Sequence, residues 1–187
     1  YDAGFSLTTG SNNLVLGMDA GFSGSPGGNA TTDSNSIRLA DENIGAAHIQ
    51  VDWTVASDQR DKTDFTALDI GLDFINDLKP YTYKWDKRSK YGDKKADDYD
   101  LNAQTPDGTH KEDWLDIGFK AQEVETLEKA AGYKIANKTN LTTTLTEDGK
   151  QYGIQYSKFI PILVKAVQEL SATVTTLQNE VNTLKGE

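Results

Sequence analysis

The sequence predicts an all-β segment over residues 1–56, followed by an α+β unit over residues 57–187 that ends in a long coiled-coil helix. Three observations lead to this division. The composition of the 187-residue chain changes near residue 56, short period-two runs of apolar residues occupy the first part, and a heptad repeat closes the second. The first part is expected to be the end of an intertwined shaft that several copies of the chain build together.

The change in composition separates two kinds of material. Residues 1–56 hold 8 of the 16 glycines and six acidic residues, but Arg38 is their one basic residue. Residues 57–187 hold the other 18 basic residues and 23 acidic ones. Each part therefore carries a net charge of −5, while the density of charge is much higher in the second.

Short alternating runs in the first part predict β-strands. Leu14 and Leu16 alternate with polar or small residues, as do Ile37 and Leu39, and the longest such run covers residues 47–55. Each run is too short to bury a face by itself, and only 36% of the whole chain is hydrophobic. A disordered linker is one interpretation. A β-structured shaft whose interior is completed by other copies of the chain explains the pattern better.

The second part has the spacing of a folded α+β unit. Apolar residues at helical spacing, strand-like alternation and turn residues follow one another. The expected elements are a helix over 65–78 ended by Pro80, a strand over 81–85, a charged solvated loop over 86–113, a strand over 117–119, a helix over 121–131 ended by Gly132, and a hairpin over 141–154.

The last element is a helix over about residues 157–186, with Ser157 as the expected N-cap. Its apolar residues are spaced alternately three and four apart for more than three heptads, which predicts self-association through a coiled coil. The alternation of Val or Ile with Leu is typical of two-stranded coils, so the repeat predicts association without fixing the number of helices. The seam consists of Ile160, Leu163, Val167, Leu170, Val174, Leu177, Val181 and Leu184.

The composition excludes several classes of function. With no cysteine, the chain has no disulfide framework, zinc finger or thiol nucleophile. The net charge of −10 argues against nucleic-acid binding, and no apolar run approaches the roughly 18 residues of a membrane span. The sequence opens on a polar stretch, so we expect no signal peptide and regard the chain as a fragment of a longer protein.

Other candidate sites are weak. Nothing in the sequence positions His48 or His110 beside a nucleophile. The acidic stretch from Asp98 has Ala103 where a calcium loop needs Gly and Thr109 where it needs Glu, so we expect no metal site. The absence of a glycine-rich phosphate loop leads us to expect no cofactor.

The sharpest motif begins at Ser57, directly at the change in composition. A serine hydroxyl becomes a nucleophile when a base removes its proton, and a lysine serves as that base when desolvation keeps it neutral. Ser57 and Lys62 are five residues apart and can meet across a turn. By itself the pattern most often belongs to a polar turn that caps a helix.

Four motif blocks, in order, resemble the C-terminal intramolecular chaperone domain of phage tail fibres and endosialidase tailspikes. The resemblance spans residues 57–187, whereas residues 1–56 resemble the fibre shafts of the family in composition alone, and no family motif lies in residues 86–113. The blocks are Ser57-Asp58-x-Arg60-x-Lys62, Leu72-Asp73-Phe74-Ile75-Asn76-x-Leu78-Lys79-Pro80-x-x-Tyr83-x-Trp85, Ile117-Gly118-Phe119-x-Ala121-Gln122-Glu123-Val124 and Tyr156-Ser157-x-x-Ile160-Pro161-x-Leu163-x-Lys165-Ala166-x-Gln168-Glu169-Leu170.

The resemblance implies a homotrimer and a self-cleaving serine endopeptidase of a single turnover, with no external substrate. The cut is expected between Ala56 and Ser57, with Ser57 as nucleophile and Lys62 as its base, acting within its own chain or on a neighbour. Asp58 and Arg60 match the motif and are expected to position the turn. The cut coincides with the change in composition, which was located independently.

The resemblance also implies partners and a location. The partners are two further copies of the chain and, for the mature fibre, a bacterial surface receptor of saccharide type. The fibre belongs to the virion tail, and the chaperone domain is released in the host cytoplasm during assembly. The alternative is a structural trimeric fibre or adhesin foot that is not cleaved and in which Ser57 is inert.

Overall fold

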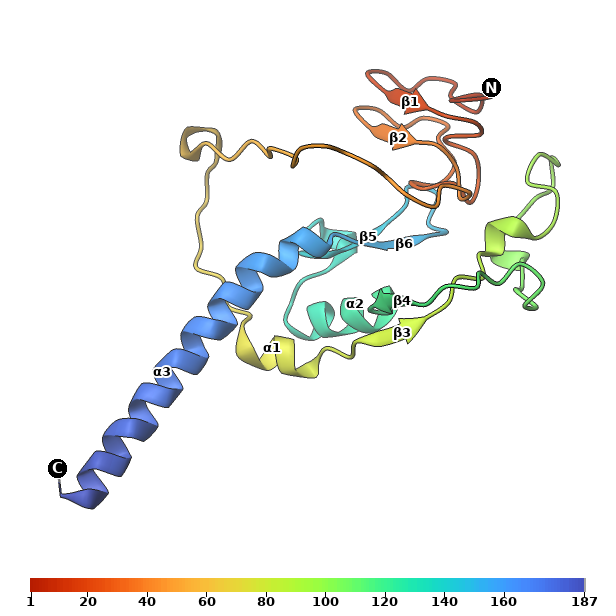
Figure 1. The fold of residues 1–187 in the computed structure, drawn as a ribbon. Helices are drawn as coiled ribbons and strands as arrows, with labels where there is room; N and C mark the ends of the chain where they lie inside the picture. The colour runs from red at the N-terminus through yellow and green to blue at the C-terminus, as the bar shows by residue number, and fades with distance from the viewer. Residues whose placement is uncertain (187) are drawn as a thin grey trace. The chain divides into compact units, whose positions relative to one another are not determined.

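The computed structural model describes residues 1–186 (Figure 1). The chain forms two compact units, each made of three segments. The first unit comprises residues 1–48, 80–121 and 144–153, and the second comprises residues 49–79, 122–143 and 154 onward. The strands are β1 (Leu14–Leu16), β2 (Ile37–Leu39), β3 (Tyr81–Tyr83), β4 (Asp116–Gly118), β5 (Thr143–Leu145) and β6 (Tyr152–Ile154), and the α-helices are α1 (Leu72–Asp77), α2 (Ala121–Ala130) and α3 (Phe159–Lys185).

Two coils of chain lie stacked at the start of the first unit (Figure 1). Strands β1 and β2 pair in parallel, with Leu14 beside Ile37 and Leu16 beside Leu39, an offset of 23 residues. The same offset continues outside the strands, where Asn12 Nδ2 donates a hydrogen bond of 2.8 Å to Asn35 Oδ1. Residues 1–48 therefore form consecutive turns of a coil with a 23-residue period.

The sequence itself repeats with this 23-residue period. The repeated residues are polar, so the pattern of alternating apolar residues did not reveal them. The backbone repeats with the sequence: Asn12 and Asn35 both have positive φ, and so do Gly17 and Ala40. A Cβ on Gly17 would lie 2.7 Å from Ala40 Cα, so close stacking of the two coils requires glycine there. The repeated sequence is Thr8-Thr9-Gly10-Ser11-Asn12 and Thr31-Thr32-Asp33-Ser34-Asn35.

The strand expected over residues 47–55 is absent from the structure. Ile49, Val51, Trp53 and Val55 alternate along an irregular stretch and are all more than half exposed. A strand needs a neighbouring strand to satisfy its backbone N–H and C=O groups, and this single chain offers none here. The trimeric β-shaft therefore stays a prediction, as does the domain boundary between residues 56 and 57.

The charged segment over residues 86–113 is not the solvated loop that its composition indicated. It contains two 3₁₀ turns, Arg88–Lys90 and Leu101–Ala103, and the side chain of Leu101 is only 1% exposed. The segment begins and ends near the antiparallel pair β3–β4, in which Tyr81 lies opposite Gly118. It is a structured part of the first unit.

The second unit is built on the contact of α1 with α3. The Leu72 N–H at the start of α1 donates a hydrogen bond of 2.7 Å to Glu169 Oε2 of α3, which satisfies a backbone group that the helix leaves free. A Cβ on Gly71 would lie 2.3 Å from the same oxygen, so glycine permits this approach. The buried apolar residues of the unit are Ile70, Phe74, Val124, Phe159, Ile162 and Ala166.

A buried carboxylate joins α2 to the start of β5. Glu128 is 1% exposed, and its two oxygens accept hydrogen bonds from the N–H and hydroxyl groups of both Thr142 and Thr143. Four donors compensate for the loss of water around the charge. Helix α2 ends at Ala130, and Gly132, two residues later, has a φ of +96°, the left-handed conformation expected of a glycine that follows a helix.

Two helix starts differ from the predictions. The helix expected from residue 65 begins at Leu72, where Gly71 has a non-helical backbone and Glu169 accepts the hydrogen bond of the Leu72 N–H. Helix α3 begins at Phe159, after a 3₁₀ turn that contains Ser157, and its N-cap Lys158 makes no side-chain cap. Within the described part of the chain no helix, α3 included, has both the length and the apolar character of a membrane span.

Candidate functional site

The segment after Ala56 folds into one tight turn. Asp58 caps a 3₁₀ turn over Gln59–Asp61, and its Oδ1 accepts a hydrogen bond of 2.9 Å from the Arg60 N–H. The Arg60 guanidinium also reaches back to the carboxylate, with Nη2 2.6 Å from Oδ2. These hydrogen bonds lower the pKa of Asp58 and raise that of Arg60. The two motif residues are thus partners of each other and hold the turn.

The turn brings the two predicted catalytic side chains together. Lys62 Nζ donates a hydrogen bond of 2.6 Å to Ser57 Oγ. Lys62 is the C-cap of the 3₁₀ turn, and its extended backbone lets its side chain reach back to the residue before Asp58. A hydroxyl in contact with an amine is one arrangement in which a base can activate a nucleophile without histidine. The chemical roles of the pair are proposed below.

The whole turn is exposed in the single chain, from Ser57 to Lys62. His110, one of the weak candidates, lies in the first unit, with its ring edge-on to Tyr91 at 4.8 Å. Across residues 1–186 no group of three acidic or histidine side chains is arranged to hold a metal ion. Of the acidic loop, Asp100 instead pairs with Lys150, at 2.8 Å.

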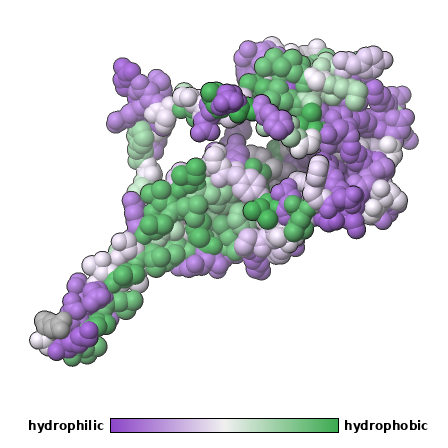
Figure 2. Space-filling view, in the orientation of Figure 1, coloured by the Kyte–Doolittle hydropathy of each residue, from purple (hydrophilic) through white to green (hydrophobic). Residues whose placement is uncertain are grey.

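The heptad seam of α3 forms a second candidate site. All eight seam residues are exposed, by 42% to 87%, and Figure 2 shows apolar residues running along this helix. The side of α3 that packs within its own unit is a different one, formed by Phe159, Ile162 and Ala166. The seam is therefore not covered by the unit that carries it. Exposed apolar surface of this extent usually marks an interaction site.

Sequence reasoning missed three features of these units. Glu169, which caps α1, lies within the motif blocks, but its partner Leu72 is 97 residues away and no local signal connects them. The ion pairs between Lys94 and the N-terminal coils were also missed, since residues 86–113 were interpreted as solvated. The 23-residue repeat could have been found by comparing the sequence with itself.

Comparison with known proteins gives one match. Residues 57–133 match the model of a peptidase family that is described as chaperone of endosialidase. No curated protein and no solved structure matches the chain. The match begins at Ser57 and covers the turn, α1, β3, residues 86–113, β4 and α2. The resemblance inferred for residues 134–187 lies beyond it and stays a prediction.

Proposed function

Because residues 57–133 are an endosialidase-type chaperone domain, we propose that this chain is the C-terminal end of a phage tail fibre or tailspike. The domain drives trimerisation and folding of the fibre and is then released by cutting its own chain between Ala56 and Ser57. The family implies a fibre-associated chaperone with a self-cleaving peptidase activity. The residues that cleave, the trimer and the attachment to a host are our additions to this.

The single observation that carries the cleavage site is the hydrogen bond of 2.6 Å between Lys62 Nζ and Ser57 Oγ. It lies directly after the proposed scissile bond, and the family match starts at the same serine. The Asp58–Arg60 pair holds the turn without competing for either group. Asp58 and Arg60 therefore act as positioning residues.

In the proposed reaction Ser57 Oγ attacks the carbonyl carbon of Ala56 while neutral Lys62 takes the hydroxyl proton. The C–N bond then breaks, the proton passes to the departing amine of Ser57, and an ester replaces the amide. Water hydrolyses the ester to a carboxylate on Ala56 and restores the hydroxyl of Ser57. Backbone N–H groups stabilise the oxyanion in both steps. No external substrate takes part, and each chain is cut once.

The exposure of the turn over residues 57–62 offers a way for assembly to control cleavage. A lysine loses its proton more readily when it is removed from water, and Lys62 is exposed in the single chain. Burial by a second copy of the chain supplies the desolvation, so the cut follows trimerisation. The base then comes from the same chain or from a neighbour in the trimer.

Two exposed apolar surfaces support a trimer of this chain. One is the seam of α3, and the other is the outer face of the stacked coils, where Leu14, Leu16, Ile37 and Leu39 are each about half exposed or more. An intertwined β-shaft has many contacts between residues far apart in sequence and folds slowly. A coiled coil that joins three chains raises their effective concentration and fixes their register. Its removal leaves the shaft kinetically trapped.

The test compares the purified protein with its Ser57→Ala variant and with Thr63→Ala, a control hydroxyl in the same exposed segment. Denaturing gels and light scattering report cleavage and oligomeric state. We expect trimers in all three proteins, and cleavage in every one except Ser57→Ala. Uncut trimers in all three would favour the rival interpretation of a permanent fibre foot. Cleavage of Ser57→Ala would exclude Ser57 as the nucleophile.

The remaining parts of the proposal follow from the fibre assignment. The mature fibre attaches to a bacterial surface saccharide as part of the virion tail, and the chaperone domain stays behind in the host cytoplasm. Binding of the cleaved fibre to cells of candidate hosts, measured with and without enzymatic removal of surface saccharide, tests this part.

A further inference from the structure

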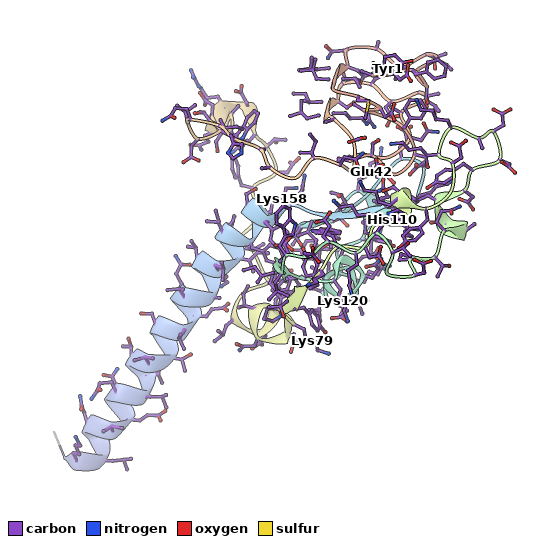
Figure 3. All side chains as sticks on the ribbon, turned by 45° about the vertical axis from the view of Figure 1, so that its right-hand side comes forward. Tyr1, Glu42, Lys79, His110, Lys120 and Lys158 are labelled. Atoms are coloured by element: carbon purple, nitrogen blue, oxygen red, sulfur yellow. The ribbon has the colours of Figure 1, made fainter. Side chains whose placement is uncertain are left out.

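The 23-residue period places one acidic position of the first coil beside its counterpart in the second. Asp19 and Glu42 are 23 residues apart, and both side chains are buried to more than nine-tenths. Asp41 lies next to Glu42 and is equally buried. The stacked coils therefore end in a cluster of carboxylates that belongs to two successive turns of the repeat (Figure 3, Glu42).

Lys94 of the segment 86–113 enters this cluster and contacts all three carboxylates, whereas Lys95 reaches Asp19 alone, with Nζ 3.4 Å from Oδ1. Lys94 Nζ lies 3.0 Å from Glu42 Oε1, 3.4 Å from Asp19 Oδ2 and 3.7 Å from Asp41 Oδ2. Its side chain is only 15% exposed. Buried carboxylates without a counter-charge are costly, so the three acidic groups and Lys94 depend on one another.

Neighbouring residues of the same segment add contacts with the coils. Lys87 Nζ donates a hydrogen bond of 2.9 Å to the Glu42 carbonyl, and Lys95 Nζ lies 2.8 Å from Asp2 Oδ2. Ser89 packs so closely on Gly24 that a Cβ there would lie 2.3 Å from the serine Cβ. The segment 86–113 thus contacts the coils through both close packing and ion pairs.

We propose that residues 87–95 are a recognition surface for the coil repeat, and that Lys94 detects whether two successive coils are stacked in register. Asp19 and Glu42 come within reach of one ammonium group only when the coils pair with the 23-residue offset. A shift of the β1–β2 pairing by one residue displaces Glu42 by about 3.3 Å relative to Asp19, which lengthens at least one of their two contacts with Lys94 Nζ. The partner is the acidic position of the fibre's own repeat, and this inference rests on the proposed chaperone function.

The test measures amide hydrogen exchange in the full chain carrying Ser57→Ala, which keeps the coils attached. The Ala40 amide, bonded to the Leu16 carbonyl, reports stacking of the coils, and the amides of α3 report the second unit. Lys94→Gln is expected to speed exchange of the Ala40 amide about tenfold or more, with α3 unchanged. Lys94→Arg, which keeps the charge, and Lys111→Gln, at an exposed lysine of the same segment, are expected to leave it slow.

A double-mutant cycle tests whether Lys94 acts through the carboxylates. Adding Glu42→Gln to Lys94→Gln removes one of the unpaired charges, so the double variant should exchange more slowly than Lys94→Gln alone. Glu42→Gln should show no such coupling to Lys111→Gln. Unchanged exchange in Lys94→Gln, absence of coupling, or equal loss of protection in α3 would each overturn the proposal. Cleavage is scored separately by mass in chains that keep Ser57, so failure of the chaperone proposal is distinguishable.

Discussion

The turn after Ala56 shows how few residues arrange the candidate site. Asp58 and Arg60 close the turn through their own ion pair, and the five-residue spacing then places Lys62 Nζ on Ser57 Oγ. This contact was foreseen as possible from spacing alone, because a short capped turn returns the chain on itself. The catalytic roles of the two residues stay predictions, since only a reaction can test them.

Replacing Lys62 by arginine tests whether Lys62 acts as a base or only supplies a positive charge. Arginine can donate a hydrogen bond to Ser57 but does not give up its proton in proteins. We therefore expect Lys62→Arg and Lys62→Ala to stop cleavage to the same degree, measured as the fraction of cut chain over time. Gln59→Ala, in the same turn, serves as the control. Normal cleavage of Lys62→Arg would exclude Lys62 as the base.

Glu128 is buried in the second unit and accepts hydrogen bonds from Thr142 and Thr143. Its removal leaves the N–H and hydroxyl groups of Thr142 and Thr143 without their acceptor, so Glu128→Ala should lower the free energy of unfolding by about 3 kcal/mol. Denaturant unfolding of the Ser57→Ala protein measures it. Glu180→Ala, at an exposed helical glutamate, should change stability by less than about 0.5 kcal/mol. Equal effects of the two would contradict this account.

At the scale of elements, the predictions succeeded where apolar spacing decides the structure. The heptad predicted α3, alternation predicted β3, and the turn residues 147–150 predicted the hairpin of β5 and β6. Apolar spacing over residues 65–71 predicted helix where the structure has none, because Gly71 and the distant Glu169 set the start of α1. The coil repeat went unseen because Thr, Ser and Asn carry it, and Lys94 meets Glu42 through a contact 52 residues apart that no local pattern encodes.

The seam of α3 predicts a charge-sensitive assembly. Leu177→Asp places a carboxylate in the coiled coil, where it must be desolvated or protonated at a cost of several kcal/mol per helix. We expect light scattering to show loss of the trimer. Asn179→Asp adds the same charge two residues later, off the seam, and should leave the trimer intact. A trimer in both variants would show that the seam does not hold the chains together.

The coils should lose stability in acid through Asp41. Burial raises the pKa of this carboxyl, but hydrogen bonds from Asn43 and the charges of Lys94 and Lys90 outweigh burial and leave the pKa below its ordinary 3.8. A pKa lowered by folding stabilises the protein above 3.8, and this contribution disappears as the pH falls through the lower folded value.

Thermal unfolding followed by tryptophan fluorescence between about pH 6 and pH 2.5 measures the effect of this group. Asp41→Asn should be less stable than the parent protein near pH 6, and the difference in stability should shrink as the pH falls toward about 2.5. Asp52→Asn, at an exposed carboxyl, is the control. A difference between Asp41→Asn and the parent that stays constant with pH would contradict the account.

At the scale of the whole molecule, both units present surfaces that a single chain does not cover. The seam of α3, the outer face of β1 and β2, and the apolar side chains of residues 49–55 are all exposed. Together with the match of residues 57–133 to the family described as chaperone of endosialidase, these surfaces support our proposal that the chain assembles with further copies and is then cut at Ser57. The surfaces that the proposed copies bury were beyond prediction from one sequence, because contacts between chains leave no local pattern.

The central claim, release of the chaperone domain by a cut between Ala56 and Ser57, is tested most directly by N-terminal sequencing and intact mass of the purified material. We predict a fragment that begins Ser57-Asp58-Gln59 and has the mass of residues 57–187, and its absence from the Ser57→Ala variant. A fragment that begins at any other residue, or the same fragment from Ser57→Ala, would contradict the account.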